Sequence, residues 1–306
     1  MANLPRLGFI GLGRMGAPMC GRLLDAGYAI TVFDVRVESM EGVLAKGAVA
    51  ASSPAEVVLA SDVIITIVPD PPAVEAVMDG ELGVLSALGA GQILLEMTTS
   101  APLLTRRLAD DVKERGARIL DAPVSGGVRG AESGKLAVMV GGDAALFEEC
   151  RPIFEQVGSY IVHAGPNPGD GHTAKLMNNL LSVAGLLASA EVLALGMRAG
   201  LDPERLTDII NHSTGRTYST EIKFPRDVFS GTYNAGFTVA QYLKDVNLAQ
   251  DLADALRVPI PMGALAKQLW LSIISRDGPD IDHTAAVRSV ARLAGLEDEA
   301  LTPRGG

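Results

Sequence analysis

The sequence has few cysteines, few aromatic residues and no excess of positive charge. Its 306 residues include 2 cysteines, too few for a disulfide framework, and 4% aromatic residues, so aliphatic side chains and methionine must build the core. Lysine and arginine total 26 against 36 for aspartate and glutamate, which gives a net charge of −10. An acidic surface repels phosphate backbones, and we therefore expect no nucleic-acid partner.

The sequence also lacks a secretory signal and a clear membrane span. Residues 1–6 contain no basic region followed by a long apolar run. The most apolar stretch, residues 176–197, contains Asn178, Asn179 and Glu191, so we interpret it as a buried helix of a soluble protein. Together with the low cysteine content, these absences lead us to expect a cytoplasmic protein without a membrane partner.

Enough apolar material is present for a large core. Apolar residues make up 48% of the chain, and its length is about twice that of a typical domain. Short β-rich runs and helical patterns alternate through the first half, which is typical of βαβ units and a parallel sheet. The expected strands are residues 7–10, 30–34, 63–68, 93–97, 117–120, 136–140 and 160–163, and the expected helices are residues 17–25, 37–45, 72–78 and 103–113.

The second half of the chain is helical in pattern. Residues 172–200 predict one long apolar helix, and Asp202 followed by Pro203 marks the start of the next helix. The change of pattern predicts two domains, residues 1–164 and residues 165–306. The polar tail, residues 297–306, is expected to fray.

A glycine-rich turn lies between the first strand and the first helix. It has the pattern GxGxxG and reads Gly11-Leu12-Gly13-Arg14-Met15-Gly16. The first glycine permits a tight turn, the second lets the backbone approach a pyrophosphate, and the third lets the helix pack closely on the strand. The helix start favours the anion through its N–H groups and its dipole. The pattern predicts a dinucleotide site, and the alternative is a glycine-rich turn without a ligand.

An acidic residue stands where the ribose of a dinucleotide would need one. Asp34 is the last residue of the second expected strand, at the spacing from the glycines at which a carboxylate accepts hydrogen bonds from the adenosine ribose. A carboxylate at this place repels a 2′-phosphate, so we predict NAD as the cofactor. NADP stays an alternative, because Arg36 could neutralise a phosphate, although a solvated role for Arg36 is the simpler interpretation.

Two segments could supply the chemistry that a hydride-transferring site needs. In the first, Ser125, Gly126 and Gly127 follow a strand end and could bind a carboxylate through a hydroxyl and backbone N–H groups; the alternative is an ordinary glycine turn. In the second, Lys175 and Asn179 are four residues apart on the long helix and share one face. Lys175 could exchange a proton with the substrate oxygen if burial lowers its pKa, and Asn179 could orient either group. The alternative is a lysine that reaches solvent from a helix end.

The order of these segments resembles the β-hydroxyacid dehydrogenase family, and within it the 3-hydroxyisobutyrate dehydrogenases. The residues from Gly8 to Met19 resemble the opening signature of that family, residues 121–128 its substrate-binding motif, and Lys175 its catalytic lysine. The resemblance covers nearly the whole chain. The pair Lys244-Asp245, which by itself would be only a charged helix start, matches a late pair of the family.

The resemblance implies a fold, an activity and a set of site residues. The implied fold is α/β: an N-terminal Rossmann-type, doubly wound, mostly parallel sheet, and an all-α C-terminal domain for substrate and oligomerisation, joined by a long interdomain helix. The implied activity is hydride transfer between NAD(H) and a small 3-hydroxy acid or its semialdehyde, in a homodimer or homotetramer. Catalysis falls to Lys175 and Asn179, substrate binding to Ser125, Gly126, Gly127, Phe237 and Asp245, and cofactor binding to the six residues of the glycine loop, Asp34, Val68, Pro69, Thr99 and Lys244.

Other functions compete with this one. A dinucleotide-binding sensor or scaffold without chemistry is the first, but such relatives typically lose the lysine that Lys175 matches. An imine reductase on the same fold is the second, but those enzymes usually carry Asp or Tyr at this position. The chain is too short for a 6-phosphogluconate dehydrogenase. No metal site is predicted.

The sequence does not identify the substrate. Residues 215–237 should shape the far end of the pocket, and one charged or aromatic side chain there could recognise a second charge on the substrate. Solvation at the surface is the expected role for each of the four candidates, which are Arg216, Tyr218, Lys223 and Arg226.

Overall fold

The computed structural model describes residues 4–297 of the chain, which form two compact units that divide after Lys175. The expected domain boundary, between residues 164 and 165, lies about ten residues before this division, at the end of strand β9 (Gly158–Gly165). The expected frayed tail lies, apart from its first residue, outside the described residues.

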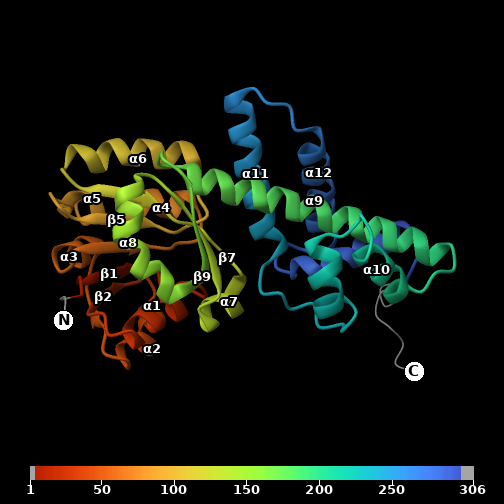
Figure 1. Cartoon of the computed structure of the whole chain (residues 1–306), viewed down its shortest axis with the longest axis horizontal. Helices are drawn as coiled ribbons and strands as arrows, with labels where there is room; N and C mark the ends of the chain where they lie inside the picture. The colour runs from red at the N-terminus through yellow and green to blue at the C-terminus, as the bar shows by residue number, and fades with distance from the viewer. Residues whose placement is uncertain (1–3, 298–306) are drawn as a thin grey trace. The chain divides into compact units, whose positions relative to one another are not determined.

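The first unit is built on a mostly parallel sheet (Figure 1). Its strand order is β3-β2-β1-β4-β5-β6-β8-β7, with β9 paired to β8. The six strands β1 to β6 are parallel where they pair, whereas β8 runs antiparallel to β6 and β7. The bounds are β1 Leu7–Ile10, β2 Ile30–Phe33, β3 Val49–Ala50, β4 Val63–Thr66, β5 Ile93–Glu96, β6 Arg118–Asp121, β7 Val124–Ser125, β8 Leu136–Gly141 and β9 Gly158–Gly165.

The strand order reverses at β1, which lies between β2 and β4. In doubly wound sheets, ligands bind at the carboxyl ends of the strands beside such a reversal. The predicted Rossmann-type fold of this unit is therefore confirmed, and its topology points to the loop that follows β1.

Helices cover both faces of the sheet because neighbouring strand residues point in opposite directions. Leu7 and Phe9 pack in one cluster with α1 and α8, whereas Ile10 and Ile64 pack in a second cluster with α3, α4 and α6. The central strands β1, β4 and β5 are buried on both faces, as their nearly continuous apolar runs predict, whereas the edge strand β3 is exposed. The helical segments of this unit are α1 Gly16–Asp25, η1 Val37–Met40, α2 Glu41–Leu44, α3 Pro54–Leu59, α4 Pro71–Met78, α5 Val84–Ala87, α6 Pro102–Glu114, α7 Gly127–Ser133 and α8 Ala144–Val157.

The second unit is helical throughout its described part. The long helix α9, Asp170–Arg198, leads into it, and Asp202 caps the next helix by accepting the Arg205 N–H at 2.9 Å, as its sequence predicts. The remaining segments are α10 Pro203–Asn211, η2 Ser219–Val228, α11 Val239–Leu256, α12 Pro261–Asp277, η3 His283–Ala285 and α13 Ala286–Leu293. Trp270 belongs to a core cluster formed by the helical segments α9, η2, α11, α12 and α13, and its indole N–H donates to the Val239 carbonyl at 2.9 Å.

Helix α9 is long and apolar enough, by length and composition alone, to cross a membrane. One face of it is nevertheless packed in the core of the second unit, through Val183, Leu186, Ala190 and Leu193. A core helix meets the same criteria of length and composition, and these contacts support that interpretation.

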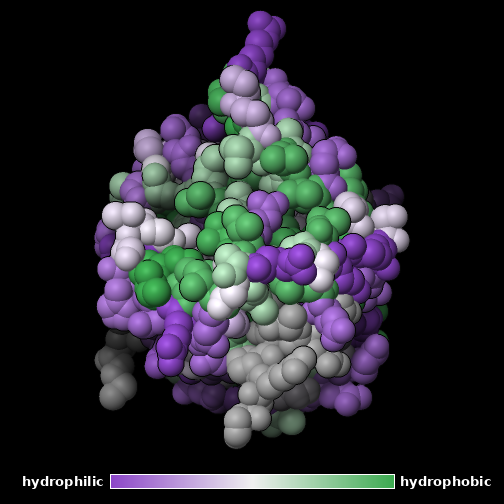
Figure 2. Space-filling view, turned by 90° about the vertical axis from the view of Figure 1, so that its right-hand side faces the viewer, coloured by the Kyte–Doolittle hydropathy of each residue, from purple (hydrophilic) through white to green (hydrophobic). Residues whose placement is uncertain are grey.

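The opposite face of α9 carries an exposed apolar stripe. The side chains of this stripe recur at helical spacing. They are Met177 (44% exposed), Leu181 (74%), Val192 (51%) and Leu195 (71%). Figure 2 looks onto the end of the second unit where α9 finishes, and apolar residues gather there in one area. Apolar area of this kind on a folded unit is typical of a surface that another molecule covers.

Candidate active site

The loop after β1 has the geometry of a dinucleotide cradle. Gly11 has a φ of +95°, and a Cβ on it would lie 2.2 Å from the Ile67 carbonyl oxygen. A Cβ on Gly16 would lie 1.9 Å from the Gly11 oxygen, so that α1 can approach β1 only if this residue is glycine. A Cβ on Gly13, by contrast, would have one atom within 4 Å, an Arg36 nitrogen at 3.8 Å.

The protein itself therefore gives no steric reason for glycine at position 13. The space beside Gly13 is where a side chain would obstruct a phosphate group approaching the backbone. This open cradle, at the N-terminus of α1, fits a pyrophosphate, which is the group that the sequence predicts there.

Asp34 holds the loop in place from the end of β2. Its carboxylate accepts hydrogen bonds from the Leu12 N–H at 2.7 Å and from the Arg36 N–H at 2.8 Å. The Arg36 guanidinium lies 3.8 Å from the same carboxylate and is largely exposed. A buried anion is thus fixed beside the glycine loop, while Arg14 in the loop is exposed.

The other predicted cofactor residues of the first unit follow the carboxyl ends of β4 and β5. Val68 donates its N–H to the Thr98 hydroxyl at 3.1 Å, Pro69 is exposed, and Thr99 is half-buried. Because β1, β4 and β5 are parallel neighbours, these ends meet at one edge of the sheet. The first unit therefore brings the glycine loop, Val68 and Thr99 to the same edge.

The predicted substrate loop follows strand β7. Ser125 ends that strand and is half-buried, and Gly126 and Gly127 have φ values of +130° and +65°. Such backbone conformations favour glycine by themselves. The structure thus supplies a conformational reason for both glycines, in addition to the predicted contact with a carboxylate.

A carboxylate of β6 fixes the start of α9. The Asp121 side chain accepts the Gly169 N–H and the His172 N–H, each at 2.7 Å. These donors are among the backbone groups that a helix start leaves without helical partners. The first turn of α9 is thereby held at the carboxyl edge of the sheet, and Lys175 stands one turn further on.

His172 is a buried residue of this edge that the sequence analysis did not single out. Its Nε2 lies 2.7 Å from the Thr98 carbonyl and 3.1 Å from a Glu96 oxygen, and its Nδ1 lies 2.7 Å from the Thr105 hydroxyl. Burial lowers the pKa of His172, but the hydrogen bond and charge of Glu96 and the charge of Asp121 outweigh it, so the pKa is raised. The His172 ring, held between Thr98, Thr105 and Glu96, is a buried support for the start of the helix that carries Lys175.

Lys175 and Asn179 are both 6% exposed and lie one turn apart on α9. Asn179 donates its amide N–H to Asp245 on α11 at 2.6 Å. The Lys244 ammonium lies 3.2 Å from the other Asp245 oxygen. The second unit therefore joins three residues that the sequence predicted from two distant segments.

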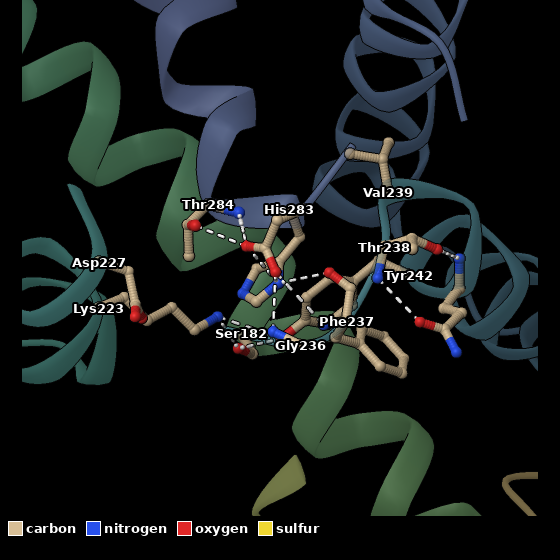
Figure 3. Close-up of polar contacts among 12 residues, drawn as sticks. Ser182, Lys223, Asp227, Gly236, Phe237, Thr238, Val239, Tyr242, His283 and Thr284 are labelled. Carbon is tan, nitrogen blue, oxygen red and sulfur yellow. Dashed lines mark hydrogen bonds and ion pairs between the residues drawn. The ribbon is translucent and has the colours of Figure 1, made fainter. Parts of the chain in front are cut away.

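Phe237 lies close to this group in the second unit. Its ring packs edge to face against Tyr242, with the ring centroids 4.8 Å apart, and its carbonyl accepts the His283 N–H at 2.9 Å (Figure 3). Tyr242 stands three residues before Asp245, on the same face of α11.

The expectation that Lys223 is a solvated surface residue is wrong. Lys223 is 4% exposed, because the helix η2 turns it toward α9 and α11, where it donates hydrogen bonds to Ser182 and Tyr242. Arg216 and Tyr218 are exposed, and Arg226 pairs with the buried Asp227 at 2.7 Å. Each of the lysines 175 and 223 lies next to apolar residues in the sequence, which is the pattern that reveals a buried charge.

Two family models match nearly the whole chain. Residues 6–165 match the model described as the NAD binding domain of 6-phosphogluconate dehydrogenase, and residues 169–290 match the model described as NAD-binding of NADP-dependent 3-hydroxyisobutyrate dehydrogenase. The first model ends and the second begins in the loop before α9.

Relatives with assigned activities are similar over almost their full length. A 2-(hydroxymethyl)glutarate dehydrogenase of Eubacterium barkeri is 40% identical, over 87% of this chain and 88% of that protein. An NAD-dependent L-serine dehydrogenase of Pseudomonas aeruginosa is 39% identical, over 92% and 96%. A solved structure of 3-hydroxyisobutyrate dehydrogenase from Mycobacterium tuberculosis with L-serine superposes with a TM-score of 0.87, at 31% identity, over 94% of this chain and 99% of that one.

With these matches, the chain belongs to the β-hydroxyacid dehydrogenase family of oxidoreductases, as its motifs predicted. Its first unit is an NAD(P)-binding domain. The roles of the individual site residues stay predictions. Within residues 4–297, no group of three or more His, Cys, Asp or Glu side chains is arranged to hold a metal ion.

Proposed function

We propose that the protein catalyses the reversible, NAD-linked oxidation of a small 3-hydroxy acid to its semialdehyde, with Lys175 as the general acid and base. The relatives named above act on molecules of this kind, hydroxy acids and L-serine. The observation that carries the proposal is the burial of Lys175 on a helix whose first turn is fixed to the cofactor edge of the first unit.

The side chains would divide the chemistry as follows. A bound NAD supplies the hydride acceptor. Lys175, as an amine, takes the proton from the substrate hydroxyl during oxidation, and as an ammonium returns it to the carbonyl oxygen during reduction. Asn179, held by Asp245, orients the substrate oxygen. Ser125 and the N–H groups of Gly126 and Gly127 bind the substrate carboxylate.

We further propose that NAD is preferred over NADP. The relatives do not decide this point, because one is named NAD-dependent and one family model is described as NADP-dependent. The buried carboxylate of Asp34 supports the proposal, since it stands at the glycine loop and would repel a 2′-phosphate.

The assembly is proposed to be a homodimer or homotetramer in the cytoplasm. The exposed stripe on α9, with Leu181 and Leu195, supports self-association, because closed symmetric oligomers commonly bury such surfaces.

The proposed function is tested by comparing the wild type with Lys175→Ala on a panel of hydroxy acids. We expect NADH formation by the wild type and turnover that is ~10²–10⁴-fold lower in the variant, the usual contribution of a positioned proton donor. Binding of NAD, measured by calorimetry, should be retained. Full turnover by the variant would contradict the role of Lys175, and a wild type that binds NAD but oxidises no hydroxy acid would favour a sensor or scaffold.

A further inference from the structure

Lys223 places a buried positive charge near the proposed reaction site. It is 4% exposed, and its ammonium donates hydrogen bonds to the Ser182 hydroxyl at 2.9 Å and the Tyr242 hydroxyl at 3.1 Å. Figure 3 shows the side chain extending from η2 toward Ser182 and the group around Phe237 and His283. Both partners of the ammonium are neutral hydroxyl groups, and the third N–H of an ammonium is left for another acceptor.

No carboxylate in the described part of the chain lies within ion-pair distance of this ammonium. The acidic groups nearby already have donors of their own. Asp227 pairs with Arg226, and Asp282 accepts hydrogen bonds from Gly236 and Thr284. A buried charge without a counter-ion costs free energy, and burial indeed lowers the pKa of Lys223 to about 8.

The ammonium lies beside the residues of the proposed reaction site. Ser182 comes three residues after Asn179 on α9, and Tyr242 comes three residues before Asp245 on α11, so each shares a face with its neighbour. Three residues of helix rise about 4.5 Å. Lys223 therefore stands about one helical turn beyond the Asn179–Asp245 pair, on the side away from Lys175.

The backbone that carries Lys223 is itself unusual. Residues Ser219–Val228 form a π-helix, in which Phe229 donates its N–H to Phe224, five residues earlier. Such wide turns are rare and are frequently found at functional sites. Here the wide turn directs a lysine into the unit, although a plain apolar residue would pack there without the cost of a buried charge.

We propose that Lys223 binds a second carboxylate of the substrate, so that the enzyme acts on dicarboxylic hydroxy acids in preference to monocarboxylic ones. The proposal rests on the proposed function and names its substrate class. A substrate whose hydroxyl lies at Asn179 and whose far carboxylate is a few carbon atoms away would reach the ammonium. The hydroxyls of Ser182 and Tyr242, 3.2 Å apart, border the same place.

The first test compares two substrates in two variants. The kcat/KM for 2-(hydroxymethyl)glutarate, a dicarboxylate, is divided by that for 3-hydroxyisobutyrate, a monocarboxylate. In Lys223→Met this ratio should fall by about 10–100-fold, the size of one charge-assisted hydrogen bond. The matched control is Lys267→Met on α12, which should leave the ratio within twofold. A ratio unchanged in Lys223→Met would overturn the proposal.

The second test needs no turnover. Glutarate should raise the melting temperature of the wild type more than butyrate does, and this difference should disappear in Lys223→Met and persist in Lys267→Met. If the wild type oxidises no hydroxy acid, the proposed function fails while this measurement still decides on Lys223. An equal response to glutarate in wild type and Lys223→Met would show that the lysine only supports the helices around it.

The pH dependence separates a bound ammonium from a merely structural lysine. The affinity of the wild type for glutarate should fall as the pH rises through about 8, because Lys223 then loses the proton that the carboxylate needs. Burial lowers the pKa of His283 to about 3 and raises that of Tyr242 to about 12, so neither changes charge near pH 8.

The charged and titratable groups that face Lys223 come from three segments. They are Tyr218, Arg226 and Asp227 of the η2 segment, Tyr242 of α11, and Asp282 and His283 beside η3. A glutarate affinity that stays level across pH 8 would contradict the proposal.

Discussion

At the level of single residues, Asp34 both positions the glycine loop and places a negative charge beside it. Its carboxylate fixes the glycine loop through the Leu12 N–H, and its charge stands beside the place that the loop prepares for a ligand. In the proposed assignment of Asp34 to the adenosine ribose, a second phosphate on that ribose would be repelled by this carboxylate.

Replacing this carboxylate should reduce the discrimination between the two nicotinamide cofactors. In Asp34→Ser, the kcat/KM for NAD divided by that for NADP should fall at least about tenfold, because about 1.4 kcal/mol of repulsion is removed. Steady-state rates with each cofactor measure it. The control is Glu38→Ser, an exposed acid of η1, which should change the ratio little. An unchanged ratio in Asp34→Ser would contradict the assignment.

The spacing of residues along the chain predicted where Asp34, Lys175 and Asn179 lie, but it did not predict the burial of Lys223. Asp34, Lys175 and Asn179 stand at fixed distances from motifs, so their placement follows from one strand or one helix. The burial of Lys223 depends on how η2 packs against two distant helices. The apolar neighbours of Lys223 in the sequence indicate burial, but they do not indicate its partners Ser182 and Tyr242, which lie on those helices.

At the level of elements, helix α9 is held at its first turn by charged side chains of the sheet. Asp121 accepts two of its N–H groups, and His172 bridges Glu96 and Thr105. The strands that hold these acids, β5 and β6, are neighbours. The helix that carries Lys175 is therefore attached to the most buried part of the first unit.

The raised pKa of His172 makes this attachment depend on pH. A pKa above the unfolded value of about 6.5 means that the stabilisation is complete below that pH and is lost as the pH rises through the folded value. His172→Gln should lower the free energy of unfolding by ~3–5 kcal/mol at pH 6 and by less at pH 9, as measured by urea denaturation.

The matched control for this prediction is a surface pair of the same kind. His212 lies 3.3 Å from Asp208 on α10 and is largely exposed, so His212→Gln should change the stability by less than about 1 kcal/mol at either pH. A loss in His172→Gln that is the same at pH 6 and pH 9 would mean that the imidazole acts without its charge.

Alternation of strands and helices made most elements of the first unit predictable. The expected strands at 7–10, 30–34 and 93–97 agree with β1, β2 and β5 within one residue at each end. The segment 215–237 gave no comparable signal, because its π-helix, Ser219–Val228, follows neither the 3.6-residue period of an α-helix nor the two-residue period of a strand. The residues that decide substrate choice are proposed to lie in that segment.

At the level of the whole molecule, each unit has a complete core of its own, yet α9 leaves an apolar stripe uncovered in the described chain. Small residues, Ala184, Gly185 and Ala188, lie along the same part of the helix and would allow another helix to approach closely. This composition is compatible with the proposed self-association through the stripe.

A single charge on the stripe should weaken such an assembly. Leu195→Glu should shift the mass measured by light scattering from that of a dimer or tetramer toward that of the monomer, because an unpaired carboxylate would be buried in the interface. Leu59→Glu, at a 72% exposed leucine of α3, is the control and should keep the mass of the wild type. A monomeric wild type would refute the interface.

Gly171, in the first turn of α9, limits changes in the length of the chain between itself and Lys175. A Cβ on it would lie 2.3 Å from the Met139 carbonyl oxygen of β8, so the helix rests directly on the strand's backbone. One residue added after this contact would rotate everything downstream by about 100° and carry the Lys175 amine round to another side of the helix. The number of residues between Gly171 and Lys175 therefore determines which side of the helix carries the Lys175 amine, and a one-residue insertion there should displace that amine from the face it shares with Asn179.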